Sequence, residues 1–113
     1  GKPLAERAEL TMAWILEGAR SYGQGWVNAA GAESLQNGGD VQSLVDRADD
    51  RAARFVLESL GLPDDDRLRA RLRPVAAFIK ALCREWLQRE TLTYADVLDL
   101  STAAVLRAVQ DGD

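Results

Sequence analysis

The strongest constraint on the fold is the segment "ETLTYADVLDL", residues 90–100, which joins two apolar helical patterns through a very short turn. Thr93 stands where it can cap the second helix, and Asp96 stands at the reciprocal position of a capping box. Leu92 and Val97 flank this cap with the spacing of a hydrophobic staple. Because the connection is so short, we expect the two helices to lie side by side, antiparallel or steeply crossed.

Apolar residues recur at steps of three and four along most of the 113-residue chain, which is the spacing of one face of an α-helix. This spacing and the chain length predict a single all-α domain over residues 1–113, an antiparallel helical bundle of about five helices. The expected helices cover residues 4–22, 24–36, 41–60, 68–87 and 94–109.

Helix ends are marked most clearly in "LGLPDDD", residues 60–66. Gly61 suits the left-handed position just past a helix end, Leu62 can fold back onto the helix, and Pro63 prevents continuation. The adjacent aspartates point in different directions, so we interpret them as caps of the next helix and not as a metal site. In that helix, Pro74 predicts either a kink or a short turn before a main helix that starts near this residue.

The charged residues of the helix expected over 41–60 fall on the face opposite its apolar stripe. The stripe, which we expect to be buried, includes Ala52, Phe55 and Val56. We interpret the charged face as solvated, with weak ion pairs such as Asp50 to Arg54. Its members are Asp46, Arg47, Asp49, Asp50, Arg51 and Arg54.

Composition argues against several classes of function. The net charge of -4 disfavours direct contact with nucleic acid, which relies on clustered Lys and Arg. The chain has no histidine, so we expect no enzymatic activity, no catalytic residue, no bound metal and no cofactor. The single cysteine, Cys83, is expected to be a packing residue. No apolar run approaches the ~20 residues of a bilayer span and no signal-like start is present, so we expect a cytoplasmic protein without membrane association.

The helix expected over residues 94–109 carries apolar side chains around most of its circumference and few charges. Such a helix is covered on more than one side. We therefore expect a homodimer in which the last two helices of each subunit pack against their copies as an intersubunit four-helix bundle. The residues expected at this interface are Leu82, Trp86, Leu98, Val105 and Val109. The alternative, that these residues pack inside one subunit, stays open at this point.

An amphipathic helix that ends in "LGLPDDD" is followed by a long helix that ends in "WLQRE", the turn "LTYADV" and an apolar last helix. This order resembles the C-terminal regulatory domain of the TetR (tetracycline repressor) family of bacterial transcriptional regulators, and the resemblance extends more loosely over "TMAWILEGARSYGQGW". It implies a homodimeric domain that binds a small apolar or amphipathic effector. It also implies that DNA is bound through an N-terminal helix-turn-helix domain. No such pattern lies within residues 1–113, so we expect the chain to be the C-terminal part of a regulator.

Aromatic residues are the candidates for the effector pocket, because they suit a cavity that is apolar with one or two orienting hydrogen bonds. Some cluster in the first two helical segments and the others lie on helices that could face them. These candidates are Trp14, Tyr22, Trp26, Phe55 and Phe78. Packing in the core is the alternative for each of them.

Two other classes of function compete with a regulatory domain. One is a stand-alone helical protein–protein interaction module whose last two helices dock another protein. The other is a small helical enzyme that uses a carboxylate such as Glu17, although the chain offers no histidine and no phosphate-binding loop.

Overall fold

The computed structural model describes residues 3–22 and 41–110; for Tyr22 and residues 41–46 the description covers the backbone alone. These residues form four α-helices: α1 (Leu4–Tyr22), α3 (Val41–Leu60), α4 (Asp66–Leu87) and α5 (Tyr94–Gln110). The all-α prediction is confirmed for this part of the chain. The helix predicted over 24–36 lies outside the described residues, so the total number of helices stays a prediction. Within the described ranges, no helix combines the length and apolar character needed to cross a bilayer.

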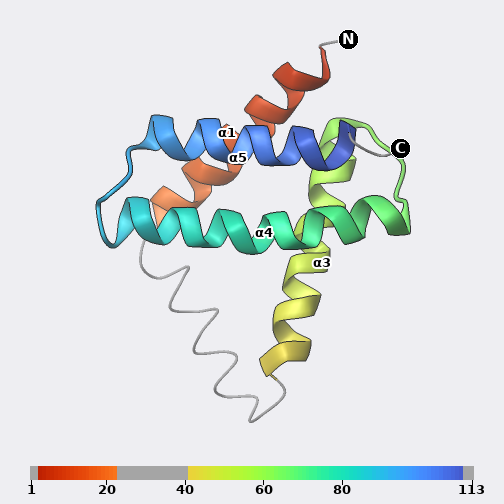
Figure 1. Ribbon diagram of the computed structural model, residues 1–113, viewed down its shortest axis with the longest axis horizontal. Coiled ribbons are helices and arrows are strands. Elements are labelled where there is room, and N and C mark those ends of the chain that lie inside the picture. Colours follow the sequence, from red (N-terminus) through yellow and green to blue (C-terminus); the bar gives the residue numbers. More distant parts are fainter. Residues whose placement is uncertain (1–2, 23–40, 111–113) are drawn as a thin grey trace.

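The helices form two layers (Figure 1). α4 and α5 lie side by side and antiparallel in one layer, while α1 crosses α5 and α3 crosses α4 in the other. The core lies where the layers meet, and its fully buried side chains include Met12, Leu57, Leu72 and Val105, one from each helix. Burial of apolar surface, worth roughly 25 cal/mol per Å², is the main interaction between the layers.

The turn between α4 and α5 contains the predicted capping box. The Thr93 backbone N–H donates to Asp96 Oδ2 at 3.0 Å, and the Asp96 N–H donates to Thr93 Oγ1 at 3.1 Å. Val97, the next residue, is fully buried. Trp86 near the end of α4 meets Tyr94 at the start of α5 edge to face, with ring centroids 5.5 Å apart. The cap and the aromatic contact together hold α5 beside α4.

Gly61 ends α3 as predicted, with the left-handed φ of 72° that favours glycine. The Leu62 N–H donates to the Leu57 carbonyl at 2.9 Å, which is the bond that closes a Schellman motif. Arg7 of α1 donates from Nη1 to the Leu60 carbonyl at 3.0 Å. The end of α3 is therefore tied both to its own last turn and to α1.

The acidic segment before α4 caps that helix, as predicted. Asp65 accepts a hydrogen bond from the Arg67 N–H at 3.4 Å. The alternative of a short turn before Pro74 is wrong, because α4 runs through this residue. Pro74 and Ala70 are both exposed, so water can reach the Ala70 carbonyl that lacks its helical donor.

The buried face of α3 follows the predicted apolar stripe only in part. Val56 and Leu60 of the stripe are buried as predicted, and Ala53 and Leu57 beside it are buried too, whereas Phe55 stays 37% exposed. The physical reason is that α3 packs against both α1 and α4, and the side that carries Ala53 and Leu57 is the one that these helices cover. The predicted burial of Phe55 is therefore wrong.

Two residues predicted at the subunit interface lie in the core of a single chain. Val105 is fully buried and Leu82 is 6% exposed, so a second copy has no access to either side chain, and their predicted interface role is wrong. The other helices of the same subunit already cover their apolar surface. Trp86, Leu98 and Val109 are half-buried and pack against the same core, and their place in an interface stays a prediction.

The two glycines Gly18 and Gly61 are expected to respond in opposite directions to alanine. Gly18 lies within α1, and beyond its chain neighbours and the backbone of α1 no atom lies within 4 Å of the position of an added β-carbon, so Gly18→Ala should raise the free energy of unfolding by about 0.5–1 kcal/mol. At Gly61, φ is 72° and the β-carbon would lie 3.1 Å from Arg7 Nη1, so Gly61→Ala should lower it by about 1–2 kcal/mol. Urea denaturation measures both changes. Effects of the same sign would contradict the geometry of the α3 end.

Candidate functional site

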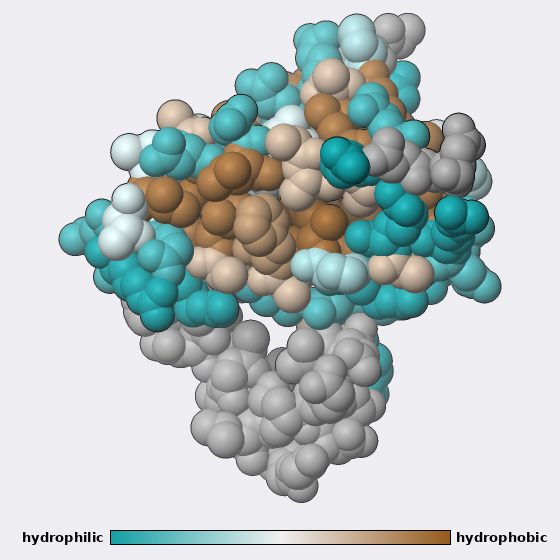
Figure 2. Space-filling view, in the orientation of Figure 1, coloured by the Kyte–Doolittle hydropathy of each residue, from teal (hydrophilic) through white to brown (hydrophobic). Residues whose placement is uncertain are grey.

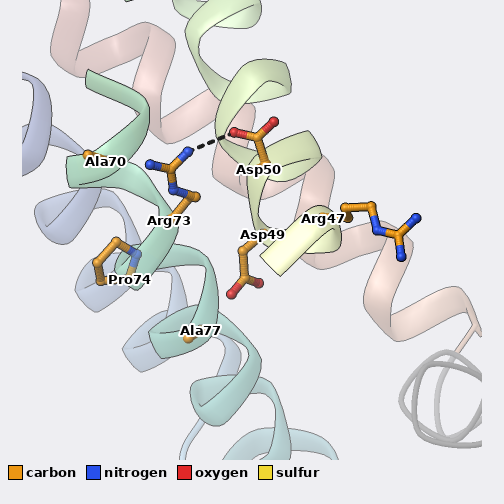
Figure 3. A pocket seen from close by; sticks show the side chains of 7 residues that line it. All are labelled: Arg47, Asp49, Asp50, Ala70, Arg73, Pro74 and Ala77. Carbon is orange, nitrogen blue, oxygen red and sulfur yellow. Dashed lines mark hydrogen bonds and ion pairs between the residues drawn. The ribbon is translucent and has the colours of Figure 1, made fainter. Parts of the chain in front are cut away.

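An open groove of about 810 Å³ runs along the boundary of α3 and α4 (Figure 3), and we call it the charged groove. It is lined by Arg47, Asp49, Asp50, Ala70, Arg73, Pro74 and Ala77. Asp50 and Arg73 point toward each other across the boundary, and Asp49 points toward α4, whereas Arg47 points away from it (Figure 3). Acidic residues of α3 therefore face α4 along this groove.

Asp50 joins α3 to α4 through two arginines. Its Oδ1 accepts a hydrogen bond from Arg73 Nη1 at 2.9 Å, and its Oδ2 accepts one from Arg69 Nη1 at 3.2 Å. Arg69 also donates to Asp64, and this hydrogen bond lowers the pKa of Asp64 and raises the pKa of Arg69. The predicted pairing of Asp50 with Arg54 on a solvated face is wrong, because α4 supplies the cations that bind Asp50.

Asp49 is buried, with 7% of the residue exposed. Its Oδ1 accepts a hydrogen bond from Lys80 Nζ of α4 at 2.7 Å, and 32% of the Lys80 side chain is exposed. The prediction that Asp49 lies on a solvated face is wrong. The signal that could have found this pair is the helical spacing from Asp49 to Ala53, Leu57 and Leu60, which places Asp49 on the face of α3 that is buried.

Lys80 also lines a small cavity of about 80 Å³ that is partly open to the surface, which we call the apolar cavity. All the described helices contribute to its wall, and Lys80 is its single charged residue. The wall consists of Ile15, Ala52, Ala53, Val56, Leu72, Val75, Ala76, Ile79, Lys80 and Val105. The space exists where α3 crosses α4, because both helices place alanines there.

The structure brings two of the predicted effector residues together, on an exposed part of the surface. Trp14 and Phe55 stack on each other, with ring centroids 5.3 Å apart, but 68% of Trp14 and 37% of Phe55 are exposed. Phe78 is 42% exposed on α4. None of these three lines the charged groove or the apolar cavity, and their role in an effector site stays a prediction. The side chain of Tyr22 and all of Trp26 lie outside the described part of the chain.

The layer of α4 and α5 carries a band of hydrophobic side chains on the side away from α1 and α3, and hydrophilic residues border it (Figure 2). We call this side the outer face. The exposed large hydrophobic residues of α4 and α5 are Phe78 and Leu100, each 42% exposed. Apolar bands with a polar border are typical of contact surfaces.

The remaining groups with shifted pKa values lie apart from the charged groove. Burial raises the pKa of the Cys83 thiol to about 11, and the residue is 1% exposed, as its predicted packing role requires. Hydrogen bonds from Thr91 and Arg89 lower the pKa of Glu85 near the end of α4. Among the described residues, no group of three or more acidic, cysteine or histidine side chains has the geometry of a metal site.

Comparison with known proteins found no similar protein, so the fold and these surfaces carry the functional proposal. No protein-family model, no curated protein and no solved structure matches the sequence.

Asp49→Ala is expected to lower the free energy of unfolding by about 1–3 kcal/mol, because the Lys80 ammonium loses its partner at a partly buried position. Glu17→Ala is the matched control. Glu17 pairs with Arg20 at 2.6 Å, but both side chains are 55% exposed, so we expect a loss below about 0.5 kcal/mol. Urea denaturation of both variants compares the two losses, and an equal or smaller loss for Asp49→Ala would contradict the buried pair.

Proposed function

We propose that the chain is the effector-binding and dimerisation domain of a TetR-type bacterial transcriptional regulator. The observation that carries this proposal is the antiparallel pair of α4 and α5, which is closed by the capping box of Thr93 and Asp96 and presents an apolar outer face. The order of helices and breaks in the sequence, which resembles that of the family, is a second support.

In the proposed dimer, the outer faces of two copies meet about a two-fold axis, and the α4 and α5 helices of both copies form an intersubunit four-helix bundle. Phe78 and Leu100 are the anchors of this contact, because they expose the most apolar surface on these helices. They replace the buried Leu82 and Val105 as interface residues. An interface of ordinary specific size buries ~800 Å² on each subunit.

The effector binds between the helices of each subunit. It shifts the dimer toward the arrangement that it binds more tightly, and this arrangement sets the spacing of two DNA-binding domains. The apolar cavity, to which all the described helices contribute, supports an effector site of this kind. DNA is contacted by a domain outside residues 1–113, in agreement with the net charge of -4, and the regulator acts in the cytoplasm.

Leu100→Glu and Phe78→Glu are each expected to convert the dimer to a monomer, because each places an unpaired carboxylate in a desolvated seam. Size-exclusion chromatography with light scattering measures the mass of each variant.

Leu10→Glu is the matched control for these variants. Leu10 is 49% exposed but lies on α1, in the other layer, so the same substitution there should leave the dimer intact. A wild-type monomer would contradict the proposal. Folded Leu100→Glu and Phe78→Glu variants that stay dimeric would place the interface elsewhere.

A stand-alone interaction module is the second candidate function. The exposed stack of Trp14 on Phe55, with Leu10 one turn away on α1, favours it, because neighbouring exposed apolar residues mark contact surfaces. A folded wild-type monomer supports this module. A coding sequence that continues upstream into a helix-turn-helix supports the regulator.

A further inference from the structure

The ion pair of Asp49 and Lys80 and the apolar cavity are parts of one continuous arrangement. Asp49 lies one helical turn before Ala53 on α3, and Lys80 lies one turn after Ala76 on α4. Both alanines line the cavity, and so does Lys80 itself. The lysine side chain therefore places aliphatic carbons along the cavity wall and its ammonium on the Asp49 carboxylate, 2.7 Å from Oδ1.

The two members of this pair differ in how easily a ligand can replace them. Asp49 is held on a helix with 11% of its side chain exposed, whereas 32% of the long Lys80 side chain is exposed. If Lys80 leaves, its ammonium can move into solvent while its aliphatic stem stays packed. If a ligand anion displaced Asp49 from Lys80, a buried carboxylate would be left without a partner, which is the costlier outcome. The pair can therefore exchange its cation more readily than its anion.

We propose that this arrangement is a binding site for a small aliphatic ammonium ion. The ammonium of the ligand takes the place of Lys80 Nζ on Asp49, and its alkyl chain occupies the apolar cavity. Asp50 lies beside Asp49 on α3, but Arg69 and Arg73 already bind it, so Asp49 is the carboxylate that receives the ligand. The net charge of -4 also favours a cationic ligand over an anionic one.

The size of the cavity limits the ligand. An engineered apolar cavity of ~150 Å³ holds benzene. The apolar cavity has about 80 Å³, and so accepts a chain of roughly three or four carbon atoms without movement of the helices. Monoalkylammonium ions from propyl to butyl fit this space. Aromatic and polycyclic amines require α3 to move away from α4.

The effect of ammonium binding on the dimer rests on the proposed function, whereas the binding itself does not. The contact of Lys80 with Asp49 is one of the ion pairs that tie α3 to α4. A ligand that pairs with Asp49 in place of Lys80 breaks this ion pair between α3 and α4. Because α4 also carries Phe78, an exposed residue that we propose as an anchor of the dimer contact, occupancy of the cavity changes the helix that forms this contact.

The test uses n-butylammonium as the probe, with butyrate and n-butanol as matched ligands of opposite and zero charge. Isothermal titration calorimetry and thermal denaturation of the full 113-residue chain report binding. We expect saturable binding of n-butylammonium to the wild type and none of butyrate or n-butanol. Lys80→Ala removes the competing cation and should tighten n-butylammonium binding on the order of tenfold, with a corresponding rise in Tm.

Arg89→Ala is the matched control for Lys80→Ala. It removes a cation that pairs with Glu85 near the end of α4, away from the apolar cavity, and it should leave the n-butylammonium affinity at the wild-type value. Asp49→Asn should abolish binding. Equal affinities of the Lys80→Ala and Arg89→Ala variants, or binding of butyrate as tight as that of n-butylammonium, would overturn the proposal.

A cavity-filling variant tests the same site if Lys80→Ala fails to fold. Ala76→Leu adds side-chain carbons into the apolar cavity without changing Asp49 or Lys80, so it should abolish n-butylammonium binding. Unchanged n-butylammonium binding by a folded Ala76→Leu variant would show that the apolar cavity is not part of the binding site.

Light scattering of the same samples separates the proposed ammonium site from the proposed function. A dimer without ammonium binding overturns this inference alone, and a monomer that binds n-butylammonium overturns the proposed function alone.

Discussion

The short capped turn between α4 and α5 is the constraint on which the rest of the fold depends. Thr93 and Asp96 satisfy each other's backbone N–H groups within a few residues of the end of α4, so α5 starts at once and returns beside α4. The two helices form a layer with two sides. One side is covered by α1 and α3, and this contact creates the core (Figure 1). The opposite side keeps an apolar band, and this is the surface through which we propose that two copies associate (Figure 2).

The boundary of α3 and α4 combines charge and apolar space in one place. Burial of the Asp49 carboxylate is possible because Lys80 supplies a cation at 2.7 Å, and Asp50 is held by arginines of α4. The alanines that face each other at the same crossing leave a small space unfilled. An aliphatic ammonium ion matches both features, since one end requires a carboxylate and the other an apolar wall.

α4 connects the two proposals. It provides Lys80 to the ion pair with Asp49 and the exposed Phe78 to the proposed dimer contact, so ligand binding at the apolar cavity would reach that contact through a single helix. Coupling of this kind needs a ligand that discriminates between two arrangements of the helix. The exchange of Lys80 for a free ammonium ion provides this discrimination, because it breaks one tie of α4 to α3 and leaves Asp49 paired.

The sequence by itself determined the features that depend on neighbouring residues. The bounds of α1, the left-handed Gly61, the acidic cap of α4 and the capping box at Thr93 were all predicted, because each depends on hydrogen bonds or periodicity within a few positions. The all-α class followed from the same local signals.

Tertiary structure alone decided how far burial extends around α3 and which residues of α5 lie inside the subunit. Periodicity defines a stripe on a helix but not the angle at which its neighbours cover it, so Phe55 and Asp49 of α3 were placed on the wrong faces. Val105 was assigned to a second copy because the sequence does not show that α1 and α4, which pack on α5, already bury it. The pair of Asp49 with Lys80 and the cavity beside it join residues far apart in the chain. Their distances depend on how the layers cross, and no local pattern encodes that crossing.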